Sequence, residues 1–248
     1  QTAMSRKIDR TVVMPEVQNR YRGSHYVNSS VTGNWADYIT KDLIQYIDSN
    51  YRTIAKASSR GLTGHSMGGR GTLYLAMSYP GNYGAIYGLS SGEMNFNENL
   101  ASPDNPDWWR KFLQLQDISD ADEEMKRMIG LAVAFTPNPD RPPFFADYQY
   151  ELVANKVVPR PDVWRKWLAF DPVALVPNHI DSLDQLRGIK FDSGLSDEIL
   201  SNSRAFAKAL TTAGIPYSYE EYEGNHYNRI RNRIETQVLP FFSETLAR

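Results

Sequence analysis

Apolar residues in the first third of the chain alternate between the short runs typical of buried strands and the wider spacing of helices. Ile39, Leu43 and Ile47 share one face and predict an amphipathic helix that begins after an Asn34 cap. Short runs between glycine and proline residues predict strands. The predicted strands cover residues 11–15, 57–63 and 85–89, and the predicted helices cover 35–51 and 71–77, the second ending at Pro80-Gly81.

The last quarter of the chain repeats this alternation. Residues 188–194 and 216–222 predict strands, and between them a helix over 197–212 is predicted from its apolar spacing, with Gly214 as its stop. Strands that alternate with helices are typical of the α/β class, so we expect a mostly parallel sheet with flanking helices. A length of 248 residues fits one domain over the whole chain.

Composition narrows the function classes. The net charge is −2 and charges of both signs are interspersed, so no nucleic-acid partner is expected. Apolar runs such as 130–135 fall far short of the roughly 20 residues that span a bilayer. The absence of cysteine excludes disulfides, thiolate metal sites and cysteine nucleophiles. Because the four histidines show no ligand spacing, we expect neither a metal nor a cofactor.

The strongest candidate for chemistry is residues 64–68, which read Gly-His-Ser-Met-Gly between a predicted strand and a predicted helix. This is the spacing of a nucleophile elbow, in which glycines allow a sharp turn that projects a strained serine from the sheet. Ser66 is therefore the predicted nucleophile. The alternative is a glycine-rich turn in which Ser66 only caps a helix.

An elbow serine needs a histidine to take its proton and a carboxylate to orient that histidine, in the chain order Ser, Asp/Glu, His. Asp197 lies between a strand and the next helix and is the predicted acid, although an acid there also suits helix capping. Asp192 is the second choice, because its direction depends on a strand register that the sequence leaves open. Glu93 is the third choice.

His226 is the predicted base, because it follows the strand at 216–222 and completes the required order. His65 occupies the variable position of the elbow. His25 and His179 lie in loop-like segments and are weaker candidates.

A stretch without strand–helix rhythm separates the strands at 85–89 and 188–194 and is far longer than an ordinary connection. We expect residues 93–180 to form a largely helical cap over the serine, with a helix near 120–134. Most of its aromatic residues are expected to form the cap's own core, and a minority to line an apolar acyl or aryl pocket. They are Trp108, Trp109, Phe112, Phe135, Phe144, Phe145, Tyr148, Tyr150, Trp164, Trp167 and Phe170.

Several motifs together resemble the putative-esterase family of α/β-hydrolases, which includes esterase D (S-formylglutathione hydrolase), feruloyl and acetylxylan esterases, and the mycobacterial mycolyltransferase antigens. The resemblance covers nearly the whole chain. It is carried by Val13-Met14-Pro15, Tyr26-Val27-Asn28-Ser29, Tyr46 to Thr53, Gly64 to Gly69, Pro137-Asn138-Pro139, Pro142 to Phe145, Asp192 to Asp197, and Tyr222 to His226.

The resemblance implies an α/β-hydrolase fold with Ser66, Asp197 and His226 as catalytic residues. It also implies an oxyanion hole, to which Met67 N–H contributes one donor. In similar proteins, strands and a His-Gly loop that supplies the second donor precede the segment matching residues 12–14. We therefore expect this chain to be a fragment that lacks those strands and any signal peptide, with a secreted or periplasmic location favoured. The rival expectation is that residues 1–10 or 20–30 supply the second donor.

The sequence thus predicts a serine carboxylic-ester hydrolase that acts on a small-molecule or carbohydrate-linked ester through an acyl-enzyme intermediate. An acyltransferase and a prolyl-peptidase-like amide hydrolase would use the same residues. Outside enzymes, the alternative is an inactive binding protein of the same fold.

Overall fold

A computed structural model describes residues 10–96 and 105–247. Its centre is a parallel sheet in the order β3-β4-β7-β8, in register from Gly61 opposite Ala85 to Gly194 opposite Tyr222. Both neighbours of each inner strand run in its own direction, so all four carboxyl ends meet at one edge of the sheet. The strands are β3 (Gly61–His65), β4 (Ala85–Leu89), β7 (Gly188–Gly194) and β8 (Ser218–Tyr222).

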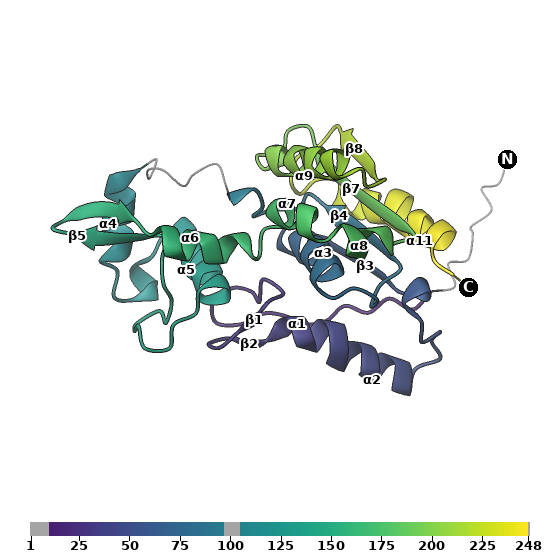
Figure 1. Cartoon of the computed structure of the whole chain (residues 1–248), viewed down its shortest axis with the longest axis horizontal. Coiled ribbons are helices and arrows are strands. Elements are labelled where there is room, and N and C mark those ends of the chain that lie inside the picture. Colours follow the sequence, from purple (N-terminus) through teal and green to yellow (C-terminus); the bar gives the residue numbers. More distant parts are fainter. Residues whose placement is uncertain (1–9, 97–104, 248) are drawn as a thin grey trace.

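Helices connect and flank these strands, and two short antiparallel hairpins lie outside the sheet (Figure 1). The hairpins are β1 (Asn28–Ser29) with β2 (Gly33–Asn34), and β5 (Tyr150–Val153) with β6 (Lys156–Pro159). The longer helices are α2 (Leu43–Asn50), α3 (Met67–Ser78), α4 (Pro106–Leu113), α5 (Glu123–Phe135), α6 (Pro161–Leu168), α9 (Leu200–Ala213) and α11 (Leu239–Thr245). Shorter ones are α1 (Trp35–Asp37), α7 (Pro172–Leu175), α8 (Ile180–Asp184) and α10 (Ile230–Arg233).

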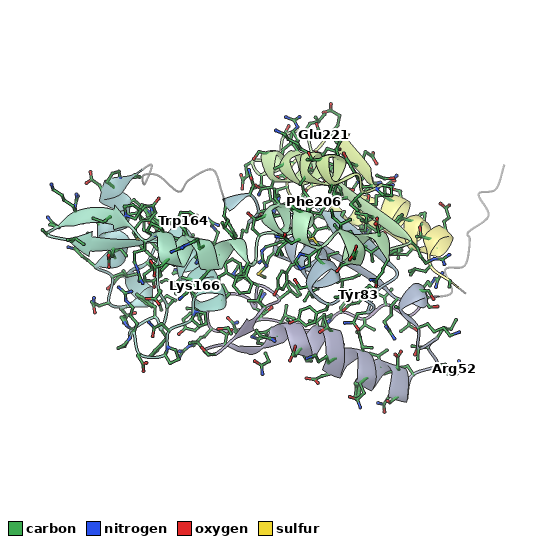
Figure 2. All side chains as sticks on the ribbon, viewed as in Figure 1. Arg52, Tyr83, Trp164, Lys166, Phe206 and Glu221 are labelled. Atoms are coloured by element: carbon green, nitrogen blue, oxygen red, sulfur yellow. The ribbon has the colours of Figure 1, made fainter. Side chains whose placement is uncertain are left out.

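Helices cover both faces of the sheet, so successive residues of β4 pack against helices on opposite sides. Ile86 packs with Leu73 of α3 and with Phe206 of α9, which is labelled in Figure 2. Tyr87 points the other way and packs with Phe242 of α11. Because successive strand residues face opposite sides, every residue of β4 is buried, as expected for the interior strand of a parallel sheet.

The part of the chain between β4 and β7 forms a second packed unit, here called the aromatic lobe (residues 105–170). Helices α4, α5 and α6 and the β5–β6 hairpin gather at the end of the molecule away from α11 (Figure 1). Most of the aromatic residues are buried in one apolar cluster, which the lobe shares with other parts of the chain such as Ile39, Tyr74 and Leu75. The β5–β6 hairpin was not predicted. The buried aromatic residues are Trp109, Phe112, Phe135, Phe144, Tyr148, Tyr150, Trp164 and Trp167.

The predicted strand at residues 11–15 is wrong. These residues have no regular secondary structure, and Val12 and Met14 are 66% and 90% exposed. No strand in residues 10–96 or 105–247 pairs with them, since β3, the nearest sheet edge in sequence, pairs only with β4. Without a neighbouring ladder, an apolar segment has neither the backbone partners nor the covered face of a buried strand.

Most other predicted elements are present with shifted ends. Strand β3 begins four residues later than expected, after a 3-10 turn at Ala57–Ser59, and α3 begins at Met67. The helix expected over 35–51 is continuous through α1, a π-helical turn at Tyr38–Asp42 and α2, but the side chain of Asn34 accepts no capping bond. Within residues 10–96 and 105–247, every helix is too short or too polar to cross a bilayer.

Gly214 ends α9, as the sequence predicts, with a left-handed φ of 74°. A Cβ added there meets nothing within 4 Å, so a substitution tests backbone conformation alone. We expect Gly214→Ala to lower the free energy of unfolding by about 1–2 kcal/mol, because L-residues avoid this region. Gly214→Asn is the matched control and should cost less, since asparagine tolerates it better. Urea denaturation of both variants measures the difference, and equal losses would contradict this origin.

Candidate active site

The Gly-His-Ser-Met-Gly segment forms a sharp strand-to-helix turn. Strand β3 ends at His65, helix α3 begins at Met67, and Ser66 between them has φ 57° and ψ −116°. Positive φ in a residue other than glycine is strained and is common at functional sites. A Cβ on Gly64 would lie 2.4 Å from the backbone of Gly68, so the turn closes only with glycine at position 64.

Ser66, His226 and Asp197 lie in one hydrogen-bonded chain. The Nε2 atom of His226 is 2.9 Å from the Ser66 Oγ, and its Nδ1 atom is 3.0 Å from an Asp197 carboxylate oxygen. His226 and Asp197 are both buried, with side chains 9% and 0% exposed. The structure therefore brings together the three residues that the sequence singled out, although 160 positions separate Ser66 from His226.

Asp197 follows β7 in a turn that its own backbone closes, because its N–H donates to the Gly194 carbonyl at 3.0 Å. Its carboxylate also accepts the N–H of Ile199 at 3.0 Å. Helix α9 begins only at Leu200 and has no side-chain cap, so the helix-capping reading of Asp197 is limited to this one turn bond.

The loops that carry Asp197 and His226 are tied to each other. Ser196 N–H donates to the Gly224 carbonyl at 2.9 Å, and Leu195 N–H donates to the Tyr222 carbonyl at 2.8 Å. A Cβ on Gly194 would lie 2.4 Å from the oxygen of Gly224. The two loops therefore approach closely, and this contact sets the position of the imidazole relative to the carboxylate.

Asp192, the second-choice acid, lies elsewhere. Its carboxylate is fully buried, pairs with Arg233 at 2.8 Å and accepts the Tyr87 hydroxyl at 2.7 Å. Burial raises the pKa of Asp192, although both partners oppose the rise. These contacts are on the α11 side of the sheet, which places Asp192 in a structural ion pair.

Glu93, the third choice, is also engaged away from His226. It lies 3.1 Å from Nδ1 of the buried His25 and 3.3 Å from Arg127 of α5. Burial opposes ionisation of Glu93, but the charges of His25, Arg127 and Arg70 prevail and lower its pKa to about 2. The carboxylate therefore links the loop after β4 to the aromatic lobe.

The remaining histidines have distinct surroundings. His179 Nδ1 lies 2.9 Å from the Leu175 carbonyl, remote in sequence from the elbow. His65 Nε2 lies 2.7 Å from the backbone oxygen of His226, and the two rings are 4.6 Å apart. Sequence analysis identified His65 only as the variable position of the elbow. Its contact with a backbone carbonyl could not be predicted, because such a contact requires no particular residue type in the partner.

The first backbone N–H of α3 belongs to Met67 and has no acceptor within the helix, so it is free to face an anion beside Ser66. The loop at residues 20–30 packs against the elbow, because a Cβ on Gly23 would meet the Met67 side chain at 2.5 Å. Gly92 lies on another side of the serine, and a Cβ there would be 3.7 Å from Ser66 Oγ. A second oxyanion donor stays a prediction.

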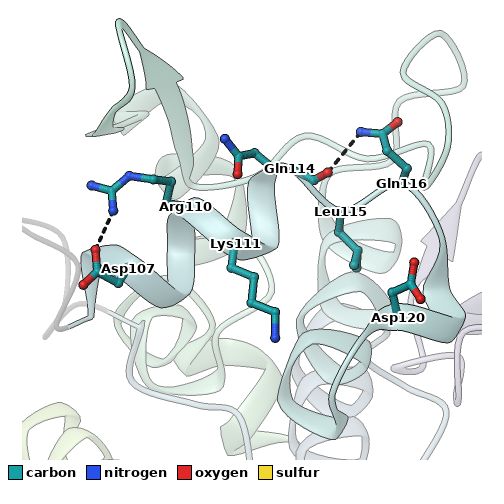
Figure 3. A pocket seen from close by; sticks show the side chains of 7 residues that line it. All are labelled: Asp107, Arg110, Lys111, Gln114, Leu115, Gln116 and Asp120. Carbon is teal, nitrogen blue, oxygen red and sulfur yellow. Dashed lines mark hydrogen bonds and ion pairs between the residues drawn. The ribbon is translucent and has the colours of Figure 1, made fainter.

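A hollow of about 450 Å³ lies on α4 in the aromatic lobe (Figure 3). It is lined mainly by charged and amide side chains and contains none of Ser66, Asp197 and His226, so it is separate from the candidate site. No cluster of three or more potential metal ligands occurs in the part of the chain that the structure describes. The hollow is lined by Asp107, Arg110, Lys111, Gln114, Leu115, Gln116 and Asp120.

The parallel sheet and the strand–serine–helix turn define an α/β-hydrolase, and solved structures support this fold. A ferulic acid esterase aligns with a TM-score of 0.57 at 18% identity over 89% of this chain and 64% of its own. The S-formylglutathione hydrolase of Staphylococcus aureus aligns with a TM-score of 0.55 at 16% identity over 89% and 69%. MPT51 of Mycobacterium tuberculosis gives 0.55 at 13% identity over 90% and 74%.

The chain belongs to the putative esterase family, whose model matches residues 5–230. Esterase Rv1288 of Mycobacterium tuberculosis is 26% identical over 219 residues, which are 88% of this chain and 42% of that protein. The S-formylglutathione hydrolase of Paracoccus denitrificans is 28% identical over 106 residues, 40% of this chain and 34% of that one. The chain thus spans less than half the length of these relatives.

The Glu93 contacts predict a pH dependence of stability. With a pKa near 2 in the folded state and about 4.3 in an unfolded chain, Glu93 stabilises the fold above pH 4.5, and this contribution is lost as the pH falls toward 2. The loss should be on the order of 3 kcal/mol. Glu93→Gln should show a shallower decline in unfolding free energy over this range, measured by denaturation at several pH values.

Glu198, an exposed residue, provides the control. Glu198→Gln should keep the steep decline of the parent chain, and a parallel decline in Glu93→Gln would show that another group titrates.

Proposed function

We propose that the chain is a serine carboxylic-ester hydrolase in which Ser66 is the nucleophile, His226 the general base and Asp197 the carboxylate that orients His226. The observation that carries this proposal is the unbroken chain of contacts from Asp197 through both nitrogens of His226 to Ser66 Oγ, at 3.0 and 2.9 Å. Nucleophile and base within hydrogen-bond reach, with the base oriented by a third group, is the arrangement that acyl transfer requires.

In this mechanism Ser66 Oγ attacks the ester carbonyl while His226 Nε2 takes the hydroxyl proton. The carbonyl oxygen becomes an oxyanion, and Met67 N–H stabilises it at the start of α3. When the intermediate collapses, the C–O bond to the alcohol breaks and His226 returns its proton to the departing alcohol. A water then attacks the acyl-serine with His226 again as base, releasing the acid and restoring Ser66. Asp197 holds the His226 tautomer and stabilises the imidazolium throughout.

We also propose that residues 93–180 form a cap insertion within one α/β-hydrolase domain. The insertion begins directly after Gly92, which lies next to Ser66. Its first residue, Glu93, forms an ion pair with Arg127 of α5. The proposed substrate is a small-molecule or carbohydrate-linked ester. The names of related proteins, an S-formylglutathione hydrolase and a ferulic acid esterase, agree with an ester or thioester substrate.

Covalent labelling tests the nucleophile. An activated serine reacts with a fluorophosphonate and an ordinary hydroxyl does not, so we expect one label, at Ser66. Ser66→Ala should abolish labelling, whereas Ser196→Ala, which removes an exposed hydroxyl from the neighbouring acid loop, should not. Peptide mass mapping locates the label. A label on another serine, or none on folded protein, would contradict the proposal.

Paired substitutions test the acid. Asp197→Asn keeps the side-chain shape but favours the wrong His226 tautomer, so kcat should fall by roughly 10⁴-fold. Asp192→Asn removes a buried charge of the same chain segment and should lower stability, because Arg233 loses a partner, while kcat of the folded protein changes little. Hydrolysis of p-nitrophenyl acetate and urea denaturation separate the two effects. The opposite ranking of kcat would reassign the acid.

A further inference from the structure

The order of the strands places the segments that carry Ser66 and His226 far apart in the sheet. Ser66 follows β3 and His226 follows β8, and these strands are at opposite edges of the sheet. Neighbouring strands lie about 4.8 Å apart, so the two edges are separated by roughly 14 Å. The loop after β8 must therefore lean back across the carboxyl edge of the sheet to bring an imidazole within 2.9 Å of the serine.

Most contacts of this loop are local. Asn225 Oδ1 accepts the N–H groups of Tyr227 and Asn228, and Asn228 Oδ1 accepts the N–H of Asn225. Such bonds shape the turn but do not locate it on the sheet. The first external tie, from Ser196 to Gly224, fixes the loop over the end of β7, two residues before His226.

A second external contact of this loop comes from His65. Its Nε2 atom lies 2.7 Å from the carbonyl oxygen of His226 itself, and the two rings are in contact with centroids 4.6 Å apart. A carbonyl oxygen can only accept, so Nε2 of His65 carries a proton and donates it. This bond joins the residue directly before Ser66 to the backbone of the residue that contacts Ser66 Oγ.

We propose that His65 is a positioning residue, whose Nε2–H anchors the backbone of His226 to the elbow and so fixes the imidazole against Ser66 Oγ. This inference rests on the proposed function and adds a residue to its machinery. His65 touches no reacting atom and acts through His226. A displacement of a reacting group by about 1 Å can cost roughly 100-fold in rate, which is why one well-placed hydrogen bond matters here.

The surroundings of His65 suit this role. The ring is partly buried, and burial lowers the pKa of His65, although the bond to His226 opposes this. The neutral ring is therefore favoured, and it donates one hydrogen bond without placing a positive charge beside His226. The Tyr227 ring lies near both imidazoles, with its centroid 4.7 Å from that of His226 and 6.1 Å from that of His65.

Two nearly isosteric substitutions isolate the hydrogen bond. Glutamine can donate an N–H from a position close to that of Nε2, whereas methionine has a similar length and no donor. With p-nitrophenyl acetate as substrate, we expect His65→Met to lower kcat roughly 10- to 100-fold with KM changed less than threefold. His65→Gln should restore most of kcat. Thermal unfolding of both variants shows whether they fold.

Equal kcat values for the Met and Gln variants, whether both high or both low, would overturn the inference. Failure of the proposed function looks different, because the parent chain would then lack both hydrolysis and the fluorophosphonate label at Ser66. A measurement on the parent chain is independent of variant folding. Imidazole ¹⁵N shifts at neutral pH should identify His65 as the Nε2–H tautomer, and an Nδ1–H tautomer would exclude the bond to His226.

Discussion

The structure depends on close approaches of backbone to backbone at the carboxyl edge of the sheet. At the elbow, Gly64 meets the backbone of Gly68, and at the other side Gly194 meets that of Gly224. A Cβ at either glycine would lie 2.4 Å from backbone atoms, a distance that no side-chain adjustment relieves. The first contact shapes the serine-bearing turn, and the second holds the histidine-bearing loop against the loop of Asp197, where His226 and Asp197 meet at 3.0 Å.

The elbow, the strands β4 and β7 and the stop at Gly214 could be predicted from sequence because each is determined locally, by glycine geometry or apolar spacing. Asp197 was preferred to Asp192 because it lies between a strand and the next helix, but what Asp192 does could not be predicted. Its side-chain direction depends on pairing in register with Leu89 and Glu220, and its partner Arg233 lies 41 positions away. Strand register is a property of the assembled sheet.

Two other features, the conformation of residues 11–15 and the contact of His65, could not be predicted from sequence patterns because they too depend on distant parts of the chain. The apolar character of residues 11–15 indicates a strand only if a neighbouring strand is there to pair with it. The contact of His65 is with a backbone oxygen, which every residue carries and no motif identifies. By contrast, the burial of most aromatic residues of the lobe could be anticipated, because many large apolar side chains in one stretch must be removed from water.

The buried guanidinium of Arg70 joins the elbow helix to two other parts of the molecule. It donates to the carbonyl of His25, in the loop beside Met67, and to that of Phe170, at the end of the aromatic lobe. It also lies 4.5 Å from the ring centre of Phe135 in α5. Burial lowers the pKa of Arg70 to about 10, which still leaves it cationic near neutral pH. The elbow, the loop and the lobe therefore share one buried charge.

The place of β4 in the sheet has a consequence for how such a site can vary. It stands between β3 and β7, and the carbonyl of its last residue, Leu89, accepts the N–H of Ser66 at 2.9 Å. Its fully buried residues, including Ile86 and Tyr87, are packed from both faces. The backbone ladder fixes the spacing of the strands, so a change in the bulk of these side chains would act on the twist of the sheet and on the helices packed against it. The twist of the sheet is thus a means of tuning the reach of His226 that acts without altering any residue that meets the substrate.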